Sequence, residues 1–255
     1  MNPGAPRKSS PMAARRVSIV VPAFNEEKLI VRSLRSIRTA LESFAERGWS
    51  SELIVCDNHS TDRTAELARA AGARVVFEPV NQIARARNTG AAAATGDWLI
   101  FIDADSFPSR ELFADVAEAM ARGDCLAGGS TVCLEGHYPI ATWINRLWNA
   151  LSRIQRWAPG SFLFCQADAF RELSGFDQTL YASEEIDLSR RLKRLARASG
   201  RRMVIVHQHP LVTSARKLHL YSPWEHLRFV VRILLSLKGA LKDPKQCHTW
   251  YDGRR

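Results

Sequence analysis

The sequence predicts an α/β fold built on a doubly wound, mostly parallel sheet, and two observations lead there. Short apolar runs rich in β-branched residues recur at 17–21, 52–56, 74–77 and 98–102, as expected of strands buried on both faces. Stretches with helical periodicity, about ten to fifteen residues long, separate these runs, and that alternation is typical of parallel strands joined by right-handed crossovers.

The first two strand–helix units are defined by clear boundaries. Pro22 ends the first strand, and Asn25 is expected to cap a helix whose first turn carries Glu26 and Glu27, where negative charge suits the helix dipole. After the second strand, Ser60 or Thr61 is expected to cap a helix that ends at Gly72.

The remaining elements follow in order, less regularly past residue 120. The third strand leads to a helix from Arg85 to Ala94, and the fourth strand is 98–102. The later elements are candidate strands at 124–134 and 161–166 with a tryptophan-rich helical stretch between them, a helix at 184–198, a short strand at 203–207 and an apolar helix at 224–241. We expect a disordered lead-in at 1–15, one domain at 16–220, and a C-terminal amphipathic helix with a basic tail at 221–255.

Composition narrows the class of protein. The hydrophobic fraction of 46% and charged fraction of 24% exclude a disordered chain. Thirty-six basic against 26 acidic residues give a net charge of +10, which suits phosphates, anionic lipid or nucleic acid. No nucleic-acid motif accompanies the charge, so we expect no nucleic-acid partner.

Cysteines and the C-terminal helix bear on location. Five scattered cysteines without a C-x-x-C pair indicate a reducing compartment and argue against structural zinc, so we expect a cytoplasmic protein. The 224–241 stretch is too short in its apolar runs to span a bilayer. It fits a helix resting on the anionic cytoplasmic face of a membrane, or equally one that packs on the sheet.

Polar clusters follow three of the strands at the point where each ends. These are 22–27, 57–62 and the pair Asp103 and Asp105. Ligands of open parallel sheets bind at this edge, so the three clusters should converge. Two carboxylates one residue apart suit magnesium or manganese; the alternative is a strand-end aspartate followed by a solvated turn. Arg85 and Arg87 offer guanidinium groups for a diphosphate, or belong to a solvated helix face.

Four segments then make a resemblance visible. VSIVVPAFNEE, ELIVCDNHSTDRT, ARARNTGAAAATGDWLIFIDADS, and GFD followed by SEEIDLSRRLK resemble, in order and spacing, the family 2 glycosyltransferases of the GT-A fold. The similarity runs from Val17 to Lys193 and implies a nucleotide-binding half and an acceptor-binding half.

The resemblance also implies roles for individual residues. Pro22, Ala23, Phe24 and Glu26 would hold the nucleoside, Asp57 the uracil or guanine base, Arg87 or Arg85 the diphosphate, Asp103 the ribose or sugar hydroxyls, and Asp105 the metal. Of the carboxylate pair Glu184 and Glu185, the second would be the general base, while Glu184 caps the helix or contacts the acceptor. A late histidine, His209 with its neighbour His207, would add a metal contact, although a backbone carbonyl or solvent is the commoner partner at such a position.

Together these features predict a metal-dependent glycosyltransferase. It would move a sugar from a nucleoside-diphosphate sugar to the hydroxyl of a saccharide or lipid-linked acceptor, as in cell envelope polysaccharide synthesis. We expect inversion; retention is the alternative, because related GT-A enzymes of either outcome share the donor half. The alternatives are a nucleotidyltransferase, which would want a glycine-rich loop that 22–27 lacks, and a non-catalytic nucleotide-sugar binder. Two positions depart from the family: Glu185 stands for the usual Asp, and Ala167-Asp168 stands for the usual basic pair.

Overall fold

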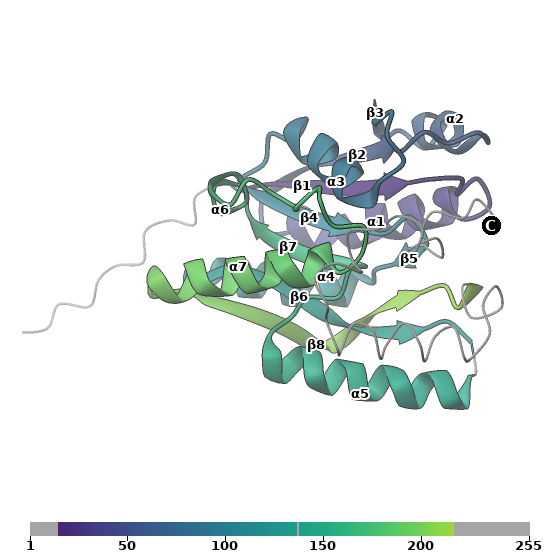
Figure 1. The fold of residues 1–255 in the computed structure, drawn as a ribbon. Coiled ribbons are helices and arrows are strands. Elements are labelled where there is room, and N and C mark those ends of the chain that lie inside the picture. Colours follow the sequence, from purple (N-terminus) through teal and green to yellow (C-terminus); the bar gives the residue numbers. More distant parts are fainter. Residues whose placement is uncertain (1–14, 137, 217–255) are drawn as a thin grey trace, which may run out of the picture.

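A computed structural model describes residues 15–136 and 138–216 (Figure 1). The elements of the first half are β1 Arg16–Ala23, α1 Ile30–Ala45, β2 Ser50–Asp57, α2 Thr64–Ala70, β3 Arg74–Phe77, α3 Ile83–Ala92, β4 Trp98–Ile102, β5 Ser106–Phe107 and α4 Arg110–Ala121. Those of the second half are β6 Cys125–Leu134, α5 Pro139–Gln155, β7 Phe162–Gln166, α6 Ala167–Glu172, α7 Glu184–Ala198 and β8 Arg202–Thr213. The predicted strands and helices occur in the predicted order within the described residues, whereas β5, α4 and α6 were not predicted.

All the described strands form one sheet in the order β3-β2-β1-β4-β7-β6-β8-β5. The pairs β3–β2, β2–β1 and β1–β4 are parallel, which gives the first half the predicted doubly wound arrangement. β7 enters antiparallel between β4 and β6, while β6 and β8 are parallel. Because β1 lies between β2 and β4, the strand order reverses there, and the loops that follow β1 and β4 diverge at that point.

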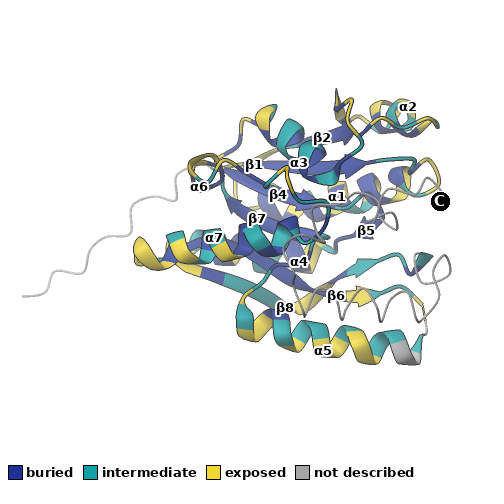
Figure 2. Ribbon diagram, viewed as in Figure 1, coloured by how far each residue is buried: buried dark blue, intermediate teal, exposed yellow. Residues whose placement is uncertain are grey.

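Helices cover both faces of the sheet, and each face has its own apolar core (Figure 2). Strand β1 shows the division: Val17, Ile19 and Val21 belong to the core under α1 and α4, and Val20 belongs to the core under α3 and α7. Alternate residues of a strand point to opposite faces, so a strand covered on both sides must be apolar throughout. This is why the strands appear in the sequence as continuous apolar runs.

The predicted helix caps after β1 and β2 are wrong. Helix α1 begins at Ile30 and α2 at Thr64, both without a side-chain cap at the N-cap residue. Asn25 instead has a left-handed backbone, with φ of 52°. Its backbone N–H donates to the Ser60 hydroxyl at 3.0 Å, and its side-chain oxygen accepts from the Thr61 N–H at 2.8 Å. These polar side chains join the two loops to each other, which neither loop's own sequence reveals.

The second half differs most from expectation at β8. The strand continues to Thr213 through an irregularity, where a single β6 residue, Thr131, faces the four residues 207–210. The predicted C-terminal helix and residues 1–14 of the predicted lead-in lie outside the described residues. Among the helices within 15–136 and 138–216, none is both long and apolar enough to cross a bilayer.

Candidate functional site

The predicted polar clusters meet at the carboxyl ends of β1, β2 and β4. Ala23 pairs with Asp57 in the parallel register, and the Asn58 N–H donates to the Ala23 oxygen at 2.8 Å. The Asp57 carboxylate accepts from the Ser60 N–H at 3.1 Å and is buried. Asp103 directly follows β4 on the other side of β1. The convergence inferred from topology is thus confirmed.

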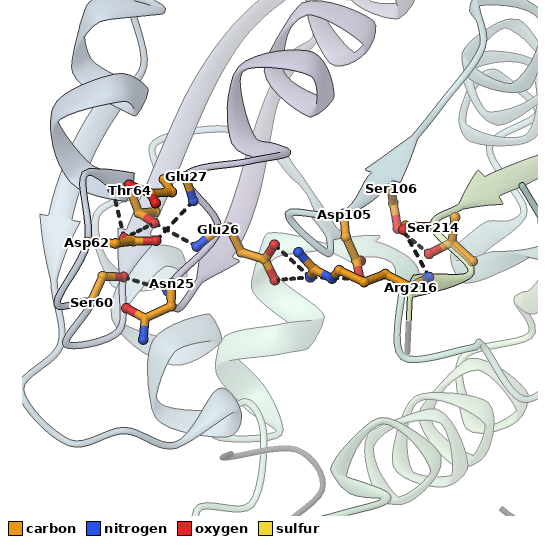
Figure 3. A network of polar contacts seen from close by, with 11 residues as sticks. Asn25, Glu26, Glu27, Ser60, Asp62, Thr64, Asp105, Ser106, Ser214 and Arg216 are labelled. Atoms are coloured by element: carbon orange, nitrogen blue, oxygen red, sulfur yellow. Dashed lines mark hydrogen bonds and ion pairs between the residues drawn. The ribbon is translucent and has the colours of Figure 1, made fainter. Parts of the chain in front are cut away.

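Glu26 is held rigidly in the loop after β1. Its N–H donates to the Thr64 hydroxyl at 2.7 Å, and the Glu27 N–H donates to Asp62 at 3.1 Å (Figure 3). The Glu26 carboxylate is buried, and both of its oxygens accept from Nη2 of Arg216 at 3.0 and 2.9 Å. The loop therefore presents a fixed, charge-compensated carboxylate beside Pro22, Ala23 and Phe24.

Asp103 and Asp105 form a tight turn after β4. The Ser106 N–H donates to the Asp103 oxygen at 3.1 Å, and the Asp105 carbonyl accepts from the Ser214 N–H at 3.0 Å. Oδ2 of Asp105 lies 3.9 Å from Nη2 of Arg216. Asp105 is buried, whereas the Asp103 side chain is 20% exposed. The two carboxylates sit at one edge of the sheet with their backbones fixed.

Arg87 is buried between the turn after β4 and the start of α7. The guanidinium is 2% exposed and donates to Glu184 at 2.6 Å, to Asp103 at 3.0 Å and to the Gly160 carbonyl at 2.6 Å. Its carbon lies 5.2 Å from the centre of the Phe176 ring. The Arg87 side chain therefore joins the turn after β4 to the start of α7. The other candidate, Arg85, is partly exposed and donates to Gln82 at 3.1 Å.

The structure distinguishes the two glutamates at the start of α7. Glu184 is buried and paired with Arg87. Glu185 is partly exposed, and its carboxyl group lies against the Cα of Gly160. Desolvation of the Glu185 carboxyl raises its pKa to about 8, with the neighbouring charge of Glu184 acting in the same direction and Arg87 opposing both. One glutamate is an anchored anion, and the other is a carboxyl group poised to exchange a proton near neutral pH.

Known proteins place this arrangement in a family. The model of glycosyl transferase family 2 matches residues 18–171. The chain belongs to this family.

Several relatives and solved structures of glycosyltransferases are similar to this family 2 chain. A pre-mycofactocin glycosyltransferase of Mycobacterium tuberculosis is 29% identical over 213 residues, covering 73% of this chain and 41% of the relative. A mannosyltransferase from Pyrobaculum calidifontis in complex with GDP-Man and Mn²⁺ has a TM-score of 0.63 at 20% identity, covering 95% of this chain and 75% of that one. Glucosyl-3-phosphoglycerate synthase from M. tuberculosis in complex with Mn²⁺ and UDP has a TM-score of 0.62 at 23% identity, covering 92% and 81%. The fold is thus the GT-A fold, and the chain spans less than half the length of the mycobacterial relative.

The carboxylates of this family 2 chain fit a divalent ion that a substrate helps to bind. Among the described residues, no three His, Cys, Asp or Glu side chains gather around one position. A magnesium-type ion commonly takes one or two carboxylates and completes its coordination with substrate phosphates and water. Asp105, with Asp103 one residue away, supplies that number of ligands.

His209 and Ala167-Asp168 lie away from these carboxylates. His209 is in the β8 irregularity, and its Nδ1 lies 3.0 Å from Asp115 on α4, while His207 Nδ1 lies 3.4 Å from the Ile205 carbonyl. The structure therefore brings His209 to Asp115 and not to Asp105. Because β7 runs antiparallel to β4, Ala167 lies at the opposite end of β4, where its N–H donates to the Asp97 oxygen. The missing basic pair is therefore a departure at the far edge of the sheet.

Sequence reasoning missed Arg216 as a site residue. Arg216 stands 190 positions from Glu26 in the sequence and belongs to none of the predicted strands or motifs. Only the pairing of β8 with β5, at Thr213 and Ser106, carries the chain back to the turn after β4.

Proposed function

We propose that this chain transfers a sugar from a nucleoside-diphosphate sugar to an acceptor hydroxyl, with inversion at the anomeric carbon. The observation that carries the proposal is the bridge formed by Arg87, which fixes Asp103 of the donor edge to Glu184 at the start of α7. A donor bound along the loops after β1, β2 and β4 would present its sugar to the residues at the start of α7. The UDP and GDP-Man bound by the neighbouring structures support a nucleotide-sugar donor.

We assign to this edge of the sheet the donor-side roles that the family resemblance implies. Glu26, beside Pro22, Ala23 and Phe24, is positioned for the ribose, and Asp57 for the base. Asp103 keeps a partly exposed carboxylate for sugar or ribose hydroxyls. Asp105 would hold the divalent ion, which when bound neutralises charge on the diphosphate leaving group.

Glu185 is the residue we assign as general base. Glu184 is committed to Arg87, whereas Glu185 is partly exposed and lies beside Gly160 at the start of the same helix. A raised pKa makes the ionised carboxylate a stronger base once formed, and such a base contributes about 10²–10⁴-fold to a rate. Glu185 would accept the proton of the acceptor hydroxyl as that oxygen attacks the anomeric carbon. The side chain of Glu185 is one methylene longer than that of the usual Asp. Gly160 has no side chain, and this leaves room beside it for the Glu185 carboxyl group.

A nucleoside-diphosphate release assay tests this function. UDP- and GDP-sugars are offered with saccharide and lipid-linked acceptors in magnesium or manganese, with Asp105→Asn as the variant and exposed Asp168→Asn as its matched control. We expect acceptor-dependent release from the wild type and the control, and loss of release in Asp105→Asn and in excess chelator. Binding of donor without any transfer or hydrolysis would favour a non-catalytic binder. Release of pyrophosphate from a nucleoside triphosphate would instead favour nucleotidyl transfer, and full activity in chelator would refute the metal assignment.

Helix α5 supports a membrane-bound or lipid-linked acceptor. Trp143, Leu147 and Ile154 are 72%, 67% and 76% exposed (Figure 2), and at about 100° per residue they fall on one side of the helix. The opposite side is polar: Asn145 and Asn149 donate to the Val132 carbonyl at 2.5 and 2.8 Å. A surface helix normally faces the core with its apolar side, so α5 is reversed.

The charge of α5 favours an anionic lipid surface as its partner. The helix contains no acidic residue, and Arg146 and Arg153 are exposed beside the apolar side. A basic helix with tryptophan and leucine on one side is typical of interfacial binding. We expect the protein to sediment with phosphatidylglycerol vesicles and not with neutral phosphatidylcholine vesicles at low salt, and Leu147→Ser with Ile154→Ser to abolish sedimentation. Unchanged sedimentation of that variant, or a dimer that the two substitutions dissociate, would contradict this assignment.

A further inference from the structure

A third arginine occupies the donor edge of the sheet, and its position is fixed by the backbone. β8 ends at Thr213, which pairs with Ser106 of β5, and the Ser214 N–H donates to the Asp105 carbonyl at 3.0 Å. The Arg216 N–H then donates to the Ser214 hydroxyl at 3.2 Å. The segment that carries Arg216 is thus attached directly to the Asp103–Asp105 turn.

The guanidinium of Arg216 lies between the two carboxylates of the site (Figure 3). Nη2 contacts both oxygens of Glu26 at 3.0 and 2.9 Å and lies 3.9 Å from Oδ2 of Asp105. The side chain is 19% exposed. Residues assigned to the nucleoside and to the metal are therefore linked by one cation.

Part of this guanidinium has no partner within the described chain. Nε and Nη1 of Arg216 are buried and make no hydrogen bond there. Buried donors without acceptors are costly and rare, and they commonly mark the place of a ligand. Nε–H and the Nη1 hydrogens point to different sides of the guanidinium, so each can donate to a separate oxygen of a diphosphate.

The other arginines near the donor edge already have partners within the protein. Arg87 is buried against Asp103 and Glu184, and Arg85 is tied to Gln82. A divalent ion at Asp105 would repel a guanidinium about 4 Å away unless an anion lay between them. A diphosphate oxygen is the anion that the proposed donor would bring to that place.

We propose that Arg216 binds the diphosphate of the donor, and that in the ligand-free chain the same side chain neutralises Glu26 and Asp105. The assignment rests on the proposed function, because it presumes a nucleoside-diphosphate donor. The segment after β8 would then supply the cation that binds the phosphates. Formation of the donor site would therefore require β8 to reach the turn after β4.

Binding measurements distinguish this role from a purely structural ion pair. Wild type, Arg216→Met, Arg216→Lys and the control Arg122→Met are titrated calorimetrically with UDP and GDP in manganese buffer, and with uridine and guanosine by NMR. Arg122 is exposed and paired with Glu118 on α4, away from these loops. Loss of charge-assisted hydrogen bonds to the diphosphate weakens binding by about tenfold or more.

We expect Arg216→Met to lose at least about tenfold in affinity for the diphosphate that the wild type binds, with nucleoside affinity within about twofold. Arg216→Lys should fall between wild type and Arg216→Met, and Arg122→Met should match the wild type. An unchanged diphosphate affinity, or equal losses for diphosphate and nucleoside, would overturn the assignment and leave the proposed function standing. A wild type that binds neither UDP nor GDP would refute the proposed function and this assignment with it.

Discussion

The raised pKa of Glu185 makes the stability of this protein depend on pH in a defined direction. The folded protein holds the carboxyl pKa at about 8, against an ordinary value of 4.5. Between these values the folded state retains a proton that the unfolded state releases. The free energy of unfolding should therefore fall as pH rises through this interval. The decrease is up to about 1.4 kcal/mol per pH unit and at most about 5 kcal/mol in total.

Glu185→Gln removes this titration and keeps the size of the side chain. We expect the variant to unfold like the wild type near pH 4.5 and to be more stable by up to a few kcal/mol near pH 8. Turnover should fall at least a hundredfold if Glu185 is the base, with donor affinity nearly unchanged. Urea denaturation at several pH values and steady-state kinetics with the identified donor measure the two effects.

Glu184→Gln is the matched control because it lies one residue away and pairs with Arg87. Weakening that buried pair should destabilise the protein, up to the few kcal/mol that a broken buried pair costs. The two glutamine variants should thus shift stability in opposite directions near pH 8. Parallel pH profiles for wild type and Glu185→Gln would refute the raised pKa, and a larger loss of turnover in Glu184→Gln would identify Glu184 as the base.

Three further predictions concern the packing around the site. Arg87→Met leaves two carboxylates without their shared cation, so we expect about 3–5 kcal/mol of destabilisation by urea denaturation, and stability equal to wild type would contradict the bridge. Gly128→Ala places a Cβ 2.3 Å from a Phe164 ring atom and 2.5 Å from a backbone oxygen, so the thermal midpoint should drop by the equivalent of about 1–3 kcal/mol. Its control is Gly48→Ala, where no atom lies within 4 Å of the added Cβ but φ is +72°. This control should lose only the stability that its backbone strain costs. Asn88→Ala removes two bonds of 2.9 Å to the backbone of residue 176, so hydrogen exchange in 174–182 should accelerate while exchange in β1 stays unchanged.

The sequence by itself determined the donor half of this protein. Strands β1, β2 and β4 are largely buried on both faces, so their apolar runs are continuous and their ends are marked by the first polar residue, whereas the edge strand β3 is only partly buried. Because parallel strands present their carboxyl ends at one edge, the positions of Asp57, Asp103 and Asp105 followed from strand order alone. The resemblance to family 2 added the roles that spacing cannot assign.

Tertiary structure decided which polar side chains contact which. Asn25 serves a neighbouring loop instead of its own helix, because its best partners, Ser60 and Thr61, come from a different strand–helix unit. Arg87 appeared in sequence as a candidate phosphate ligand, but its burial against Glu184, 97 residues away, makes it a bridge between the two halves. Local sequence patterns indicate periodicity and turns. They do not indicate contacts between side chains that are far apart in the sequence and are brought together by the sheet.

The direction of β7 and the path of β8 were likewise invisible in the sequence. An antiparallel β7 has the same apolar pattern as a parallel one, yet its direction moves Ala167 from the donor edge to the opposite edge of the sheet. The four-residue irregularity at 207–210 lets β8 continue to Thr213, and only then does Arg216 reach Glu26 and Asp105. Strand direction and register depend on the packing of whole faces against each other, so the final cation of the site was set by the fold and not by any motif.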